Sequence, residues 1–95
     1  MKGLIVEYLP SAMQDIRDIL DYYDDAAGLK ELFLKDLDGS ASQMSTFPES
    51  TPSLLGGYRR KLMSHFPYAI YYAIESRRVN VVRIFHTKRR PDSWR

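Results

Sequence analysis

The sequence predicts an α+β fold in which a small, mostly antiparallel sheet packs against an N-terminal helical hairpin. Three observations support this class. One short β-rich stretch comes first, two amphipathic helical stretches follow it, and three more β-rich stretches follow with no helix between them. The expected order is therefore strand, helix, helix, strand, strand, strand. The chain is expected to form a single domain over residues 1–95, a length that allows one modest core.

The first half of the chain contains the first strand and the first helix. Residues 3–9 (GLIVEYL) are rich in β-branched and aromatic side chains, and Pro10 ends that stretch. Ser11 and Gln14 form a capping-box pattern, which predicts that a helix begins there. The apolar residues of this helix recur at helical spacing: Met13, Ile16, Ile19, Leu20, Tyr23, Ala26 and Ala27.

A second helix is expected after a cap at Gly28. Gly39 and Ser40 weaken the middle of this stretch, so we expect the helix to break there. The short connection around Gly28 predicts that the two helices form an antiparallel hairpin. The apolar stripe of the second helix consists of Leu29, Leu32, Phe33, Leu37 and Met44.

The second half of the chain contains a loop and three strands. Residues 46–57 (TFPESTPSLLGG) carry two prolines and a Gly-Gly pair and predict a loop. Strands are expected at residues 58–63, 67–75 and 79–86. A three-residue turn at residues 76–78 would pair Glu75 with Val79 and set the register of the last two strands.

This register divides the strand residues between two faces of the sheet. Tyr68, Ile70, Tyr72, Ile74, Val82, Ile84 and His86 are expected to face the helices, because they are the more apolar set. Ala69, Tyr71, Ala73, Val81, Arg83 and Phe85 are expected on the outer face. In the strand at 58–63, Leu62 is expected inside, which sends Arg59, Lys61 and Met63 to the outer face. The prediction is an outer patch of cations and aromatic rings, extended from the strand end by Lys88, Arg89 and Arg90.

The charge of the chain is divided unevenly along its length. Residues 1–57 hold four Lys/Arg against ten Asp/Glu, whereas residues 58–95 hold ten against two, and the formal net charge is +2. Two interpretations stay open: the basic half meets an anionic partner, or the acidic half neutralises it within the fold. A patch of cations and aromatic rings could bind phosphates and stack bases, or it could bind an acidic peptide.

Composition excludes several other classes of protein. The chain has no cysteine, so disulfides and thiolate metal sites are excluded, and neither a metal nor a cofactor is expected. No apolar run approaches the roughly 20 residues of a membrane helix. Residues 1–9 lack the length and the cleavage site of a signal peptide. We therefore expect a cytoplasmic protein without a membrane partner.

Three stretches taken in order carry a resemblance to a known family. They are SAMQDIRDILDYY at residues 11–23, FPESTPSLLGGYRRKL at 47–62 and FPYAIYYAIESRRVNVVRIFHTKRRP at 66–91. Their order and spacing resemble the ParE/RelE superfamily, the toxins of bacterial type II toxin–antitoxin systems. The Pro-Tyr-x-Ile-x-Tyr strand, and the later strand that ends in a hydrophobic residue followed by His-x-x-Arg, are most similar to the ParE branch.

The resemblance implies both a fold and a function. The family fold is a small sheet backed by an N-terminal helical hairpin, and its members arrest growth until a cognate antitoxin binds them. The ParE branch is associated with inhibition of DNA gyrase, whereas the RelE branch cleaves messenger RNA on the ribosome. The resemblance therefore implies a ParE-like toxin that forms a hetero-oligomer with its antitoxin. The alternatives are a RelE-type endoribonuclease and a non-toxic nucleic-acid-binding domain.

For the ribonuclease alternative, the resemblance implies a metal-free catalytic set of Arg59, Lys61, His86 and Arg89. Two positions depart from that branch: Ala69 stands where it has a phosphate-binding arginine, and Trp94, nearest to its late tyrosine, cannot act as an acid or base. The pKa of an unperturbed histidine would suit His86 for proton transfer. However, the predicted register turns His86 toward the helices, where a packed histidine is the commoner case. We therefore expect no assembled catalytic set.

The remaining candidates are binding residues. The residues expected to bind the target are Arg59, Lys61, Arg83, Lys88, Arg89 and Arg90. The residues expected to contact the antitoxin are Ile16, Leu20, Tyr23, Tyr71, Phe85 and Trp94. The antitoxin's acidic side chains are expected to meet the basic half of the chain.

Overall fold

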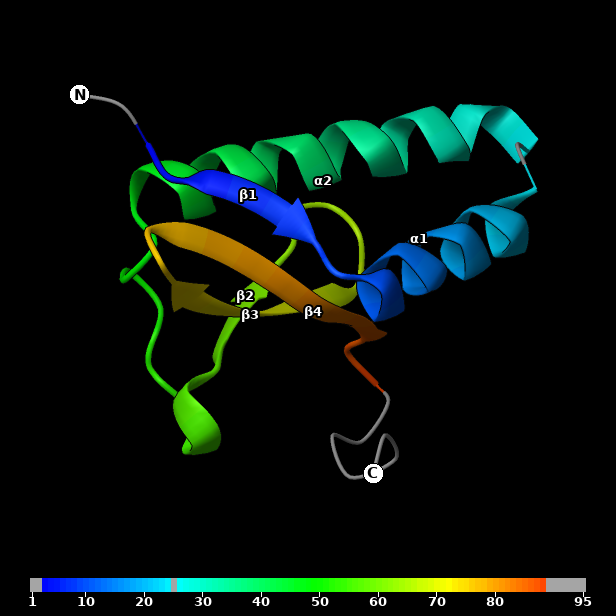
Figure 1. Ribbon diagram of the computed structural model, residues 1–95. Coiled ribbons are helices and arrows are strands. Elements are labelled where there is room, and N and C mark those ends of the chain that lie inside the picture. Colours follow the sequence, from blue (N-terminus) through cyan, green and yellow to red (C-terminus); the bar gives the residue numbers. More distant parts are fainter. Residues whose placement is uncertain (1–2, 25, 89–95) are drawn as a thin grey trace.

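Two helices and four strands occur in the expected order, which confirms the α+β class (Figure 1). The computed structural model describes residues 3–24 and 26–88. The helices are α1 (Pro10–Tyr23) and α2 (Leu29–Thr46), with short 3₁₀ turns at Ala26–Gly28 and Leu55–Gly57. The strands are β1 (Ile5–Tyr8), β2 (Arg59–Leu62), β3 (Tyr68–Glu75) and β4 (Arg78–His86).

The four strands form one sheet in the order β1-β4-β3-β2. The β2–β3 and β3–β4 pairs are antiparallel and the β1–β4 pair is parallel, so the sheet is mostly antiparallel as predicted. Figure 1 shows α1 and α2 as a hairpin along one side of this sheet. The core between hairpin and sheet consists chiefly of Ala12, Ile19, Phe33, Leu37, Met44, Met63, Tyr68, Ile70, Tyr72, Val79, Val81 and Ile84.

The boundaries of both helices differ from those expected. The α1 helix begins at Pro10 after Leu9, because the Ser11 hydroxyl donates to the Val82 carbonyl (2.7 Å) instead of capping the helix. Gly28 precedes α2 with a left-handed backbone (φ 71°), so it opens the second helix and does not close the first. No break occurs at Gly39: α2 continues to Thr46, because Phe33, Leu37 and Met44 on either side of that point are all buried.

The first turns of α1 take over from β1 as the partner of β4. The β1–β4 ladder ends where Tyr8 pairs with Val81. Beyond it, the Leu9 N–H donates to the Val81 carbonyl (2.9 Å), and the Asp15 carboxylate accepts the Ile84 N–H (2.8 Å). The Val81 carbonyl and the Ile84 N–H on this edge of β4 are therefore satisfied by Leu9 and by the first turns of α1.

The β3–β4 hairpin differs from the prediction in the length of its turn, and a bulge further along the strands compensates for the resulting shift in register. The turn has two residues, Ser76 and Arg77, both with positive φ (51° and 62°), and Glu75 pairs with Arg78. Neither residue is the Gly or Asn typical of such a turn, so the residue types do not predict it. A bulge at Val82, between Tyr71↔Arg83 and Tyr72↔Val81, then restores the expected register. Consequently Val81 faces the core and Val82 the outer face, the reverse of the prediction.

Candidate functional site

The strand cations do not form the outer patch that the sequence predicts. In β2, Arg59 lies opposite Tyr72 and Lys61 opposite Ile70, so both side chains share the face of the core and the helices. Arg60 and Leu62 share the outer face with their partners Tyr71 and Ala69. The prediction was one residue out of register: Leu62 is 55% exposed, whereas Met63 is 7% exposed and belongs to the core.

Arg59 binds a loop of its own chain. Its guanidinium donates to the carbonyl of Thr51 and more weakly to that of Glu49 (3.5 Å). The hydroxyl of the neighbouring Tyr72 is 2.8 Å from the Pro48 carbonyl and 2.9 Å from the Thr51 hydroxyl. Arg59 and Tyr72 together therefore hold residues 48–51 against the end of the sheet.

Arg83 is also engaged within the chain. Its guanidinium forms a two-pronged ion pair with Asp15 of α1 (2.9 and 3.1 Å) and lies 4.4 Å from the centre of the Phe85 ring. The hydrogen bond that Arg83 donates to Asp15 raises the pKa of Arg83 above its ordinary value, and burial opposes this increase only in part. Four cations among the described residues 58–88 have no hydrogen-bond or ion-pair partner for their side chains: Arg60, Lys61, Arg77 and Lys88. Arg89 and Arg90 lie outside the described residues.

Most of the residues expected to contact the antitoxin are at least half-buried. Ile16, Leu20 and Tyr23 pack against the core, and Tyr23 stacks edge-on against Phe66 with ring centres 5.4 Å apart. On the outer face, Tyr71 and Phe85 form a second small cluster with Ala69 and Val82 and are at most 7% exposed. They therefore do not form the open stacking surface that the sequence predicts. Trp94 lies outside the described residues.

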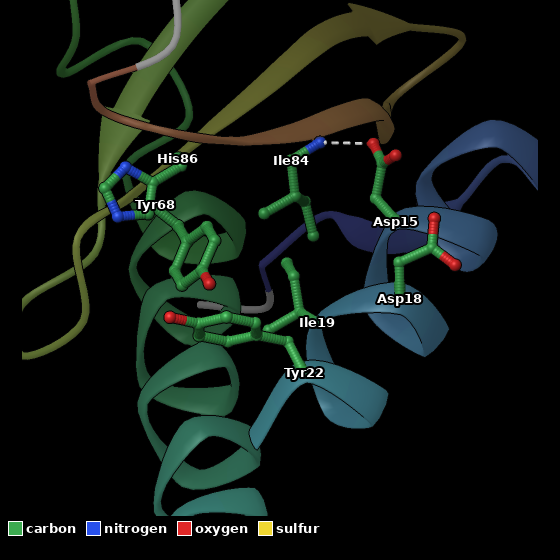
Figure 2. Close-up of a pocket in the computed structure, with 7 residues that line it drawn as sticks. All are labelled: Asp15, Asp18, Ile19, Tyr22, Tyr68, Ile84 and His86. Atoms are coloured by element: carbon green, nitrogen blue, oxygen red, sulfur yellow. Dashed lines mark hydrogen bonds between the residues drawn. The ribbon is translucent and has the colours of Figure 1, made fainter. Parts of the chain in front are cut away.

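His86 faces α1, as the predicted register requires, and lines a pocket of about 340 Å³ between this helix and the end of β4 (Figure 2). Its ring lies edge-on to that of Tyr68, with centres 5.3 Å apart. Its Nδ1 atom accepts the Lys88 N–H (3.2 Å), which assigns the proton of the neutral ring to Nε2. The pocket is lined by Asp15, Asp18, Ile19, Tyr22, Tyr68, Ile84 and His86.

The charged groups around His86 are acidic. Asp15 is neutralised by Arg83, but Asp18 is exposed and accepts only a hydrogen bond from the Gln14 amide (2.9 Å). No lysine or arginine side chain lines this pocket among the described residues. A phosphodiester inside this pocket would therefore be repelled by Asp18, and none of the described residues that line the pocket would supply a lysine or arginine side chain to bind it.

A buried carboxylate of α2, not predicted as a functional residue, holds the turn between β2 and β3. Asp36 of α2 accepts the N–H groups of His65 and Phe66 (both 2.9 Å), and its side chain is only 5% exposed. Burial raises its pKa, but these hydrogen bonds outweigh burial and hold the pKa below its ordinary value of 3.8. Asp36 lies on the same buried face of α2 as Phe33, Leu37 and Ser40. A carboxylate at helical spacing among apolar residues was the sequence feature that could have indicated a structural role.

The family follows from a sequence comparison. A family model described as the ParE toxin of the type II toxin–antitoxin system, parDE, matches residues 6–91. The chain belongs to the ParE toxin family. No protein of curated function matches its sequence.

Two solved structures have a fold similar to that of this ParE-family chain. The chromosomal ParDE TA system from P. aeruginosa is similar with a TM-score of 0.73 and 18% identity, over 90% of this chain and 98% of that one. The isolated E. coli RelE toxin is similar with a TM-score of 0.58 and 13% identity, over 97% of this chain and 93% of that one. Both similarities confirm the fold predicted from the sequence.

The residues expected of a ribonuclease are spread over this ParE-family fold. Arg59 lies opposite Tyr72 and His86 opposite Tyr68, on either side of β3. Strand geometry puts their backbones roughly 16 Å apart. No group of three or more metal-binding side chains occurs in the described ranges, nor does any helix there have the length and hydropathy to cross a membrane.

Proposed function

We propose that this ParE-family chain arrests growth by inhibiting DNA gyrase and that a cognate antitoxin neutralises it. The observation that carries the choice of target is the environment of His86. Its pocket contains Asp18 and an already paired Asp15, and no lysine or arginine side chain described here lines it. A ribonuclease needs a cation at the scissile phosphate beside its acid or base.

The position of Arg59 supports the same choice. Its guanidinium donates to the carbonyls of residues 49 and 51. Arg59 pairs with Tyr72 of β3 and His86 pairs with Tyr68, and the buried residue Ile70 lies between these two positions. Ala69, where the RelE branch has an arginine, is 3% exposed and belongs to the outer cluster. These features favour a toxin that acts by binding a protein target.

Two assays separate gyrase from the ribosome as the target. The purified chain should inhibit supercoiling of relaxed plasmid by gyrase, and induction in cells should produce no codon-specific cuts on translated transcripts when these are mapped by primer extension. Cuts that appear within minutes of induction, and vanish in an Arg59→Ala, Lys61→Ala double variant, would replace this proposal with a ribosome-dependent endoribonuclease. Gyrase acts on DNA in the cytoplasm, so we place the activity there.

The antitoxin partner is tested separately from the target. The protein encoded by the adjacent gene should co-elute with this chain in size exclusion at micromolar concentrations and should restore growth when both are expressed. Separate elution would remove the main support for neutralisation and would leave the supercoiling result unaffected.

A further inference from the structure

A shallow groove runs along one side of α2 and is not used by the function proposed above. We call it the α2 groove. Its volume is about 420 Å³, and it is lined by Leu32, Lys35, Asp36, Gly39 and Gln43 of α2 and by Ser64, His65 and Phe66 of the β2–β3 connection. The Leu32 side chain is 52% exposed there, so the groove leaves apolar surface open to solvent.

Gly39 is one of the α2 residues that line the groove, and no steric contact requires a glycine there. It occupies the interior of an 18-residue helix, where glycine is among the least favourable residues. A Cβ atom added to it would meet nothing within 4 Å, so no close approach within the chain requires a glycine. What the missing side chain does is expose a flat stretch of backbone between Lys35 and Gln43, one turn to either side. Such a stretch lets the backbone of a second helix approach closely.

The charges of the groove favour an acidic occupant. Lys35 lies exposed on one wall, whereas the His65 ring on the other wall has its Nδ1 atom 3.3 Å from the Asp36 carboxylate. Asp36 is the one carboxylate among the lining residues, but it is turned toward the N–H groups of His65 and Phe66. The carboxylate therefore fixes the second wall of the groove. The other lining groups are apolar or neutral polar apart from one exposed cation, Lys35.

We propose that the α2 groove binds an amphipathic helix of the antitoxin that crosses α2 at Gly39. This helix would place an apolar side chain against Leu32 and Phe66 and an acidic side chain near Lys35. The proposal rests on the proposed function in that the partner is the antitoxin.

The test substitutes Gly39, because replacing it should raise the stability of the toxin while lowering its affinity for the antitoxin. The Gly39→Ala variant should have a higher Tm than the wild type, since alanine is the better helix former and the space is open. Its affinity for the purified product of the adjacent antitoxin gene should nevertheless fall, and Gly39→Leu should weaken that affinity by about tenfold or more. Calorimetric titration measures the affinity and thermal unfolding of the free toxin measures the Tm.

Two matched pairs on the same helix provide the controls. Leu32→Ala should weaken antitoxin binding, whereas Leu34→Ala, which removes a similarly exposed side chain (42%) that does not line the groove, should not. Lys35→Glu should weaken binding, whereas Lys30→Glu, outside the groove, should leave it within about twofold of the wild type.

The outcomes separate this proposal from the proposed function. Wild-type affinity in both Gly39 variants would overturn the groove as the binding site while leaving neutralisation by the antitoxin intact. A wild-type toxin that does not bind the antitoxin would overturn both. A dimer of the free toxin that Gly39→Leu dissociates, measured by sedimentation, would assign the groove to a second copy and would also overturn the proposal.

Discussion

The carboxylate of Asp15 joins α1 to β4 by accepting the N–H of Ile84 and both prongs of the Arg83 guanidinium. Its side chain is 11% exposed. Asp15→Ala would leave the Ile84 N–H without its partner and Arg83 without its counter-charge. The free energy of unfolding should fall by about 2 kcal/mol in urea denaturation.

The matched control for Asp15 is Asp18, one turn further along the same helix. It is exposed and hydrogen-bonded only to Gln14, so Asp18→Ala should cost less than about 0.5 kcal/mol. Equal losses in the two variants would mean that the link from Asp15 to β4 does not stabilise the fold.

Asp36 should make the stability of the protein depend on pH in the acid range. Its pKa is lowered in the folded state, so its contribution is fully present above the unfolded-state value near 3.8 and is lost as the pH falls through the lower folded value. Asp36→Asn should reduce the free energy of unfolding by about 1–2 kcal/mol at pH 7, and this difference should shrink below about pH 4. Denaturant titrations of both proteins between pH 7 and pH 3 measure it.

The control for this pH dependence is Asp38→Asn, at an exposed position of the same helix. Its difference from the wild type should be small at every pH. A difference between Asp36→Asn and the wild type that stays constant from pH 7 to pH 3 would contradict the assigned direction of the Asp36 pKa.

The register of β2 can be tested with two neighbouring apolar residues. Met63→Ala should lower the free energy of unfolding by about 2–3 kcal/mol, because that side chain is buried in the core. Leu62→Ala should cost less than about 1 kcal/mol, because Leu62 is mostly exposed on the outer face. The reverse ranking in thermal or chemical unfolding would restore the register expected from the sequence.

The cluster of cations after β4 is expected to meet the target. Lys88 is exposed, and we predict that replacing Lys88, Arg89 and Arg90 with alanine changes the stability by less than about 1 kcal/mol. Growth arrest and gyrase inhibition should nevertheless weaken sharply, and wild-type inhibition should fall as salt rises, as expected of charge contacts.

A second triple variant distinguishes the effect of the position of these cations on toxicity from the effect of the net charge. Replacing Arg17, Lys30 and Arg77 with alanine removes the same charge from other parts of the chain and should leave toxicity intact. If the first variant folds normally and stays fully toxic, the working surface lies elsewhere, and the unpaired strand cations Arg60 and Lys61 become the next candidates.

The incorrect register of β2 has a specific physical cause. Strand side chains alternate with a period of two, so a stretch such as RRKLM with adjacent apolar residues permits two registers that differ by one residue. The contacts that select one of them come from distant parts of the chain. Asp36 holds residues 65 and 66, and Met63 packs in the core.

The order of the elements, the helical hairpin, the mostly antiparallel sheet and the toxin family can all be predicted from the sequence, because they depend on local periodicity and on motifs read along the chain. Which cations remain unpaired, and which groups surround His86, depends on the folded structure. The Asp15–Arg83 pair joins residues 68 positions apart, and Arg59 donates to a loop whose existence the sequence predicts but whose contact with Arg59 it does not. Side-chain pairing depends on such three-dimensional neighbours, and these exist only once the helices have packed against the sheet.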